Sequence, residues 1–197
     1  MKNVLVAILL LAGTLPNNVY ALDLTPHEIA VSSDGPPVKR YFFQDASKRV
    51  TFRMDNKMTV NGAAEAAAFR FNDLKSAGMT LSKSSMKPEM PFDQKNLESY
   101  RSVARSFVPQ NSSDVQLESE KADAVAINGW TSYQFAFTYN LFGIPYRRSV
   151  TFINYGEKEQ IIFDVSGAKA DYEKIYARSY RVLNSLTEFL STTAGPT

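Results

Sequence analysis

Residues 130–190 decide the fold, and they read WTSYQFAFTYN LFGIPYRRSV TFINYGEKEQ IIFDVSGAKA DYEKIYARSY RVLNSLTEFL. Aromatic and polar side chains alternate through 132–141, so one face of a predicted strand collects five residues: Tyr133, Phe135, Phe137, Tyr139 and Leu141. Segments 146–155 and 160–165 predict two further strands, separated by turns at 142–145 and 156–158. The nearly continuous apolar run 160–165 is typical of a strand that is covered on both faces.

A long amphipathic helix is predicted after the third strand, from about residue 169 to 190. Tyr172 and Tyr176 lie on its apolar stripe. We interpret the aromatic strand face as core beneath this helix, against which these two tyrosines pack. The alternative is an apolar ligand pocket, and its lining would be Tyr133, Phe135, Phe137 and Tyr139.

Shorter elements precede this region. Strands are predicted at 38–44, 49–54, 78–82, 115–118 and 122–127, and a helix at 93–107 with Asp93 as its N-cap. Residues 63–71 are ambiguous, because the alanines favour a helix while Phe69-Arg70-Phe71 favours a strand, and we favour the strand. Together the patterns predict an α+β fold. An antiparallel sheet is sandwiched by helices, preceded by N-terminal strands and closed by the long C-terminal helix.

The first 21 residues have the pattern of a cleaved signal peptide. Lys2 is followed by an apolar run, Pro16, and a cleavage site after Ala21. The run is shorter than a membrane span, and a retained N-terminal anchor is the alternative. We therefore expect a periplasmic or secreted protein. Its parts would be a flexible lead-in at 22–37, a single domain at 38–190, and a disordered tail at 191–197.

The composition excludes several classes of function. The chain has no cysteine, which excludes disulfides, thiolate metal sites and the lipid-attached cysteine of a lipoprotein. Without Lys2, 21 basic residues face 20 acidic residues, a net charge of +1. Such a balance argues against a nucleic-acid partner and against attraction to anionic lipid, since both need a clustered basic excess.

The order of elements resembles the PsbP-like fold family, which includes the extrinsic photosystem II proteins and many exported bacterial proteins. The matching residues are Gly129-Trp130, the strand segment 147–152, the hairpin 156–158, and the helix from Asp171-Tyr172 to Ser185-Leu186. The resemblance covers about 115–190 well and the earlier elements loosely. It implies an antiparallel sheet between helices and a role as a binding or accessory module. A cystatin-like or other α+β sheet is the alternative.

No set of residues predicts catalysis or a bound cofactor. His27 is the only histidine and lies in the expected lead-in, so neither a catalytic triad nor a zinc site has a basis. Asp164 stands within an apolar strand, where a carboxylate must be paired or face a cleft. We expect an ion pair, for example with Arg148, or a cap to the following helix. A carboxylate-based hydrolase would need a second acid close to Asp164.

Basic residues supply the candidate partner-binding surface: Arg147, Arg148, Lys174, Arg178 and Arg181. Adjacent strand residues point to opposite faces, so one of the two strand arginines should pair within the fold. The three helix residues form a basic stripe that would suit an acidic partner. The leading hypothesis is an exported, non-enzymatic module that engages an envelope protein or complex. The alternative is a carrier of a small apolar ligand or lipid.

Overall fold

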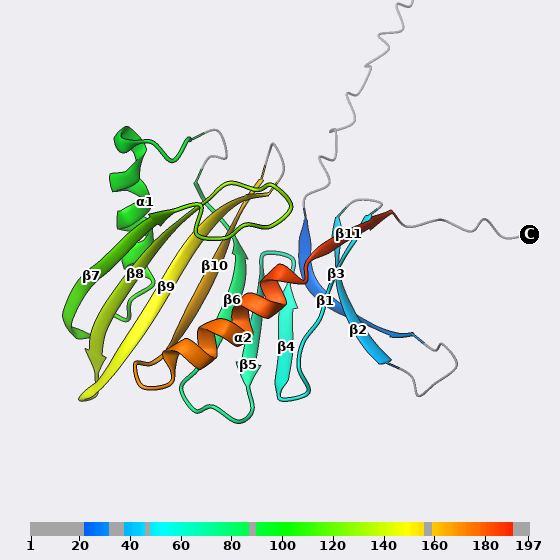
Figure 1. Cartoon of the computed structure of the whole chain (residues 1–197), viewed down its shortest axis with the longest axis horizontal. Helices are drawn as coiled ribbons and strands as arrows, with labels where there is room; N and C mark the ends of the chain where they lie inside the picture. Colours follow the sequence, from blue (N-terminus) through cyan, green and yellow to red (C-terminus); the bar gives the residue numbers. More distant parts are fainter. Residues whose placement is uncertain (1–21, 32–37, 46–47, 87–89, 156–158, 191–197) are drawn as a thin grey trace, which may run out of the picture.

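The computed structural model describes residues 22–31, 38–45, 48–86, 90–155 and 159–190 (Figure 1). The larger sheet contains β4 (Met58–Ala63), β5 (Ala66–Phe71), β6 (Gly78–Lys83), β7 (Ser113–Ala122), β8 (Ser132–Leu141), β9 (Ile144–Tyr155) and β10 (Glu159–Ala168). The smaller sheet contains β1 (Asp23–Val31), β2 (Val38–Asp45), β3 (Lys48–Phe52) and β11 (Thr187–Leu190). The helices are α1 (Gln94–Ser106) and α2 (Tyr172–Asn184).

Both sheets are antiparallel. The larger one has the order β4-β5-β6-β10-β9-β8-β7, and the smaller one has the order β1-β2-β3-β11. The three strands predicted from residues 130–168 are adjacent in the larger sheet, so this part of the prediction is confirmed. The predicted turn 156–158 lies outside the described residues. The α+β class, with a sheet between helices, is also confirmed.

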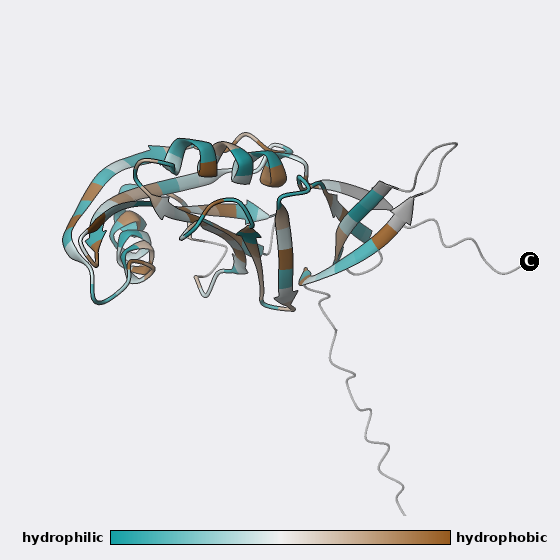
Figure 2. Ribbon diagram, turned by 90° about the horizontal axis from the view of Figure 1, so that it is seen from below, coloured by the Kyte–Doolittle hydropathy of each residue, from teal (hydrophilic) through white to brown (hydrophobic). Residues whose placement is uncertain are grey.

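The two helices lie on opposite faces of the larger sheet (Figures 1 and 2). Phe135 and Phe137 of β8 are fully buried in one core cluster with Tyr100 of α1. On the other face, α2 packs in a second cluster with Ile153 and Phe163. The aromatic face of β8 therefore lies beneath α1, and the prediction that it lies beneath the last helix is wrong. Period-two alternation identifies the residues that share a face, but it contains no information on which helix covers that face.

Residues 63–71 form strand rather than helix, as we favoured. Asn61-Gly62, whose composition is typical of a turn, instead lies within β4, and the chain turns at Ala64-Glu65. A Cβ on Gly62 would lie 2.7 Å from the carbonyl oxygen of Ala66 and 3.0 Å from that of Leu24. Glycine is required here because the backbones approach closely, and that approach joins the start of β1 to the larger sheet.

The prediction of a flexible lead-in at 22–37 is wrong for residues 22–31, the part that the structure describes. Residues 23–31 form the edge strand β1, which pairs with β2, and the side chains of Leu22 and Leu24 are buried. Pro26 interrupts the ladder at a register shift, a position where an edge strand tolerates proline. His27 lies on this strand with its ring 5.0 Å from that of Phe42.

The long C-terminal helix ends at Asn184, earlier than predicted, and the chain continues as β11 beside β3. α2 therefore packs on the larger sheet and leads directly into the smaller one (Figure 1). Within the described residues, neither helix has the length and apolar character needed to cross a membrane. The expected signal peptide and C-terminal tail both lie outside the described residues.

Candidate functional site

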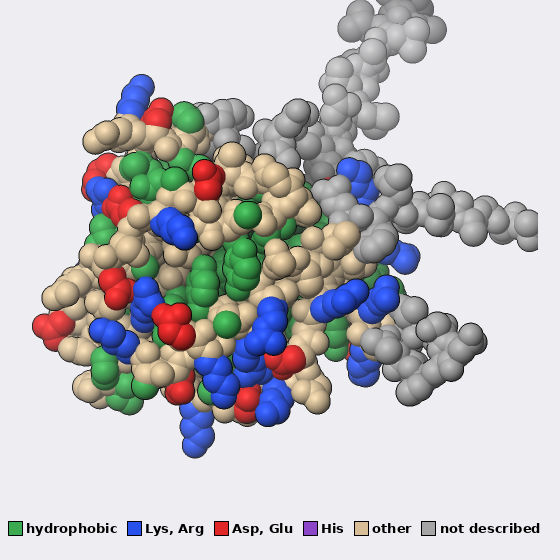
Figure 3. All heavy atoms as spheres, viewed as in Figure 1, with side chains coloured by type: hydrophobic (Ala, Val, Ile, Leu, Met, Phe, Trp, Pro, Cys, Tyr) green, Lys and Arg blue, Asp and Glu red, His purple; other side chains and the backbone are tan. Residues whose placement is uncertain are grey.

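A hollow of about 310 Å³ lies between α2 and strands β8 and β9, on the sheet face that carries α2. We call it the tyrosine groove. Its lining residues come from β7, β8, β9, α2 and the segment after β7: Lys121, Ala124, Gln134, Arg147, Ser149, Tyr172, Glu173, Tyr176 and Tyr180. Figure 3 shows this face of the molecule, with apolar and aromatic side chains in its central depression.

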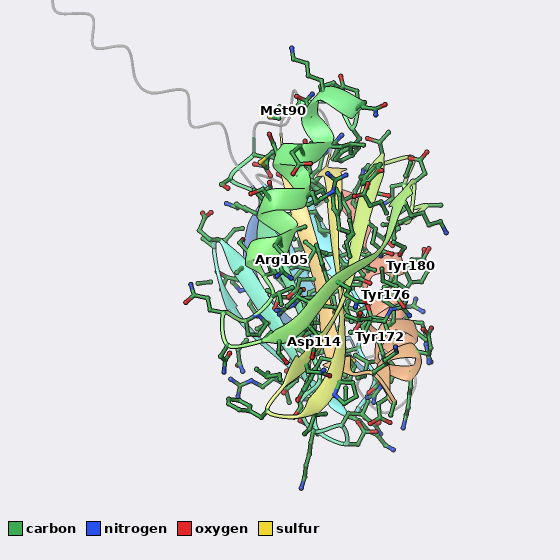
Figure 4. The ribbon with its side chains drawn as sticks, turned by 90° about the vertical axis from the view of Figure 1, so that its left-hand side faces the viewer. Met90, Arg105, Asp114, Tyr172, Tyr176 and Tyr180 are labelled. Carbon is green, nitrogen blue, oxygen red and sulfur yellow. The ribbon has the colours of Figure 1, made fainter. Side chains whose placement is uncertain are left out.

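Three tyrosines of α2 form one wall of the groove. Tyr172, Tyr176 and Tyr180 are spaced four residues apart, so they share one face of the helix. Their rings stack in sequence, with centroids 5.9 Å and 6.3 Å apart. Figure 4 shows the three side chains in line along α2. The row is about two helical turns long. Tyr172 is only 2% exposed and belongs to the core cluster under α2, so the accessible part of the wall is formed by Tyr176 and Tyr180.

Hydrogen bonds hold the two inner tyrosines to the sheet. The Tyr172 hydroxyl donates to Ser149 Oγ at 2.6 Å, and Gln134 Nε2 donates to the Tyr176 hydroxyl at 2.9 Å. Burial raises the pKa of both phenols, so both stay neutral at physiological pH. Tyr180 has no hydrogen-bond partner among the described residues, so its hydroxyl remains open to a ligand.

Arg147 closes one end of the groove. Its Nη1 lies 2.6 Å from Glu173 Oε1, and its guanidinium carbon lies 4.9 Å from the centre of the Tyr172 ring. Its Nε lies 2.7 Å from Glu118 Oε2, without the alignment of a hydrogen bond. The guanidinium is thus fixed by two carboxylates and a ring. The groove end is polar without carrying a free positive charge.

Arg148 and Arg178, two of the predicted partner-binding residues, are engaged in ion pairs within the fold, and Arg178 is buried while Arg148 is partly buried. Arg148 donates to Asp164 through Nε and Nη2, at 2.8 Å and 3.1 Å, so the predicted ion pair is confirmed. Burial raises the pKa of Asp164, and Arg148 opposes that shift. Arg178 donates to Asp55 and to Asp73. Both arginines therefore stabilise the fold.

Lys174 and Arg181 are exposed and have no acidic partner in the described part of the chain. Because Arg178, between them in sequence, is only 6% exposed, the three helix residues do not form one exposed basic stripe. Arg147 reaches the tyrosine groove instead. The five predicted residues are thus distributed over separate environments.

The predicted aromatic pocket is filled. Phe135, Phe137 and Tyr139 are at most 4% exposed and pack in the α1 core cluster, and Tyr133 is half-buried against Phe92. Phe137 also borders a surface hollow of about 450 Å³ between α1 and β7. The four rings are core contacts, which matches the interpretation of this face as core.

No group of three metal-ligating side chains occurs within the described residues. The groove was missed from the sequence because its tyrosines fit the apolar stripe of a helix. One signal was present: tyrosine recurs at every fourth position from 172 to 180, beside the aliphatic core residues Ile175, Val182 and Leu183. Tyr172 belongs to the same core cluster, so only Tyr176 and Tyr180 supply accessible rings, and tyrosine is enriched at protein interfaces.

No family model matches the chain, and no curated protein matches it. Among solved structures, it is similar to LpqN of Mycobacterium tuberculosis, which is involved in cell envelope biogenesis, with 10% identity and a TM-score of 0.49 over 83% of this chain and 91% of that one.

A protein of unknown function, PA94 of Pseudomonas aeruginosa, shares 11% identity at a TM-score of 0.45, over 82% of this chain and 96% of that one. The PsbP of the cyanobacterium Synechocystis shares 14% identity at a TM-score of 0.43, over 84% of this chain and 93% of that one. A PsbP is thus among the structures similar to this chain, as the sequence predicted. At these identities and TM-scores, no function transfers from any of the three.

Proposed function

We propose that this protein is an exported, non-enzymatic accessory module that binds an envelope protein or complex through the tyrosine groove. The observation that carries the proposal is the row of three stacked tyrosines beside an open hollow, of which Tyr172 is buried and Tyr176 and Tyr180 are partly exposed. Hydrogen bonds hold Tyr172 and Tyr176 to the sheet. Tyrosine and arginine are enriched where protein interfaces concentrate their binding energy. Rings already fixed by hydrogen bonds lose little entropy on binding, and so favour affinity.

The hairpin between β8 and β9 is a second feature that supports the proposed partner-binding surface. Phe142 at its tip is 86% exposed and has φ of 53°, and Ile144 beside it is 50% exposed. A phenylalanine in the left-handed region is strained as well as poorly hydrated. Strained residues concentrate at functional sites. The two strands that form this hairpin also supply Gln134, Arg147 and Ser149 to the groove.

The test is crosslinking in intact cells, followed by purification of the tagged protein. Wild type should recover one reproducible envelope partner, and Tyr180→Ala should lower that recovery about tenfold, as expected for an interface hot spot. The matched control is Tyr146→Ala, because Tyr146 stacks on Tyr139 at the α1 face. Equal recovery by wild type and both variants would remove the groove from the proposal.

The alternative function is a carrier of a small apolar ligand, with the tyrosine groove as its site. The volume, about 310 Å³, is at the lower end of the range for ligand pockets. Native mass spectrometry of protein purified from the envelope should then show a bound ligand that Tyr176→Ala releases. A mass equal to that of the bare chain would contradict the carrier.

A further inference from the structure

We propose that a second site, at the junction of the smaller sheet and α2, binds a phosphate group of an organic phosphate ester. Three arginines line a hollow of about 310 Å³ there: Arg40, Arg53 and Arg181. Its other lining residues are Thr51, Phe52, Asn184, Ser185 and Thr187. We call this hollow the arginine groove. Figure 3 shows Lys and Arg side chains gathered over α2 and over the neighbouring strands of the smaller sheet.

Two of the arginines lie at the end of the β2–β3 ladder. Tyr41 pairs with Phe52, the last residue of β3, and this pair is flanked by Arg40 on β2 and by Arg53 just beyond β3. Like charges close to one another repel. The last turn of α2 adds Arg181 as a third positive charge. The fold thus brings three positive charges to one hollow.

The charge of the groove is not neutralised within the described residues. Arg40 and Arg53 form no side-chain hydrogen bond or ion pair there, and Arg181 donates only to the carbonyl oxygen of Ala177, at 3.4 Å. Neighbouring Arg178, by contrast, is fully engaged by Asp55 and Asp73. Two carboxylates therefore neutralise Arg178, whereas the three arginines of the groove have no carboxylate partner within the described residues.

The walls of the groove are held together by backbone contacts. The Arg53 amide donates to Ser185 Oγ at 2.8 Å, and that hydroxyl donates to the Val182 carbonyl oxygen. This link ties the end of β3 to the end of α2, and pairing of Thr187 with Thr51 continues it into β11. The three exposed arginines thus extend from a backbone frame that the ligand does not have to order.

The chemistry of the lining selects the ligand. Guanidinium groups donate two parallel hydrogen bonds to phosphate oxygens, and a phosphate monoester carries a charge close to −2 at neutral pH. A second hollow of about 360 Å³ shares Arg53, Arg181 and Ser185 with the first and extends to Met54 and Val182. The ion pair of Asp55 with Arg178 also lines this second hollow, so the phosphate is placed in the first hollow and the organic group in the second. The two hollows together have room for a phosphate and the organic group attached to it. Soluble phosphate esters and lipid headgroups share this chemistry.

The experiment titrates the full mature chain with glycerol phosphate at physiological ionic strength, and follows the backbone amides by NMR. We expect saturable changes in the amide chemical shifts of Asn184, Ser185 and Thr187 in the wild type. This result does not depend on whether any variant folds. Arg53→Gln and Arg181→Gln should each weaken binding about tenfold or more. Arg105→Gln is the matched control, since Arg105 lies on α1, across the sheet from α2 (Figure 4).

A second arm identifies the source of the phosphate. Phosphatidylcholine vesicles with and without phosphatidic acid are sedimented with wild type and the same variants. Binding to phosphatidic acid vesicles that depends on Arg53 and Arg181 assigns a lipid headgroup, whereas a response to glycerol phosphate alone assigns a soluble ester. The proposal is overturned if neither probe gives a saturable response. It is equally overturned if Arg105→Gln weakens binding as much as the groove variants do.

Discussion

At the scale of single residues, Phe142 gives the sharpest test of the interface. It precedes Gly143, and both have positive φ, 53° and 79°, as in the two-residue hairpin turn for which Asn-Gly is preferred. Phe142→Asn should therefore stabilise the chain by about 0.5–1 kcal/mol in urea denaturation. The same variant should recover less of the envelope partner, because it removes an exposed ring.

Phe142→Tyr is the control for that substitution, since it keeps the aromatic ring and the strain and should behave as wild type in both measurements. A Phe142→Asn variant that is more stable and also recovers the full amount of partner would separate the hairpin tip from the interface.

The ion pairs of Arg178 predict how stability depends on pH. The hydrogen bond from Arg178 lowers the pKa of Asp55 below its ordinary value of 3.8, and likewise that of Asp73. A lowered folded-state pKa adds stability above 3.8, and that stability is lost as the pH falls through the folded value. Urea denaturation between pH 7 and pH 2 should show this fall in the free energy of unfolding of the wild type.

Asp55→Asn should be less stable than wild type at pH 7, and the difference should shrink below pH 3.8. Glu65→Gln removes an exposed ion pair with Lys83, and its free energy of unfolding should fall with pH as that of the wild type does. A constant difference between Asp55→Asn and wild type across the whole range would show that Asp55 acts through packing rather than charge.

At the scale of elements, the contact of α2 with β10 depends on Gly167. A Cβ there would lie 2.2 Å from Cδ1 of Ile175, whose side chain is 1% exposed. Gly167→Ala should therefore cost about 1–3 kcal/mol of unfolding free energy, the range for overpacking a core. Ile175→Val deletes Cδ1 and should cost about 0.5–1.5 kcal/mol alone.

The double variant tests that contact directly. Because Ile175→Val removes the atom that an alanine at 167 would meet, the double variant should lose less stability than the sum of the two single losses. Strictly additive losses in urea denaturation would show that the alanine is accommodated elsewhere.

Elements with strong periodicity were predictable, and those where two patterns compete were not. β8, β9 and β10 follow from alternation and apolar runs. β1 was missed because Pro26 and the turn-forming segment after it resemble a loop, although Leu22 and Leu24 are buried. β11 was missed because Leu186, Phe189 and Leu190 continue the spacing of a helix stripe beyond Asn184.

The ion pair of the buried carboxylate Asp164 was predictable from the sequence, whereas the two grooves were not. A carboxylate in an apolar strand must be paired, which indicated the bond between Asp164 and Arg148. The tyrosine groove depends on which helix covers which face of the sheet, and the arginine groove depends on a second sheet. Both are consequences of tertiary packing between segments far apart in the sequence.

At the scale of the whole molecule, α2 separates the two proposed sites. Tyr180 lines one groove and Arg181 the other, and the two sets of lining residues share no member. The two proposals are therefore independent, with the protein partner on the face of the larger sheet and the phosphate ester at the smaller sheet. On the opposite face, packed aromatic rings fill the space under α1, and a surface hollow lies between α1 and β7.

The most direct test of the tyrosine groove is a photo-crosslinking amino acid placed at Tyr180, with the same probe at Arg105 on α1 as the opposite-face control. Illumination of intact cells that produce the protein should give one discrete adduct with an envelope protein from position 180 and none from 105. No adduct from position 180, or the same adduct from both positions, would contradict the groove as the partner-binding surface.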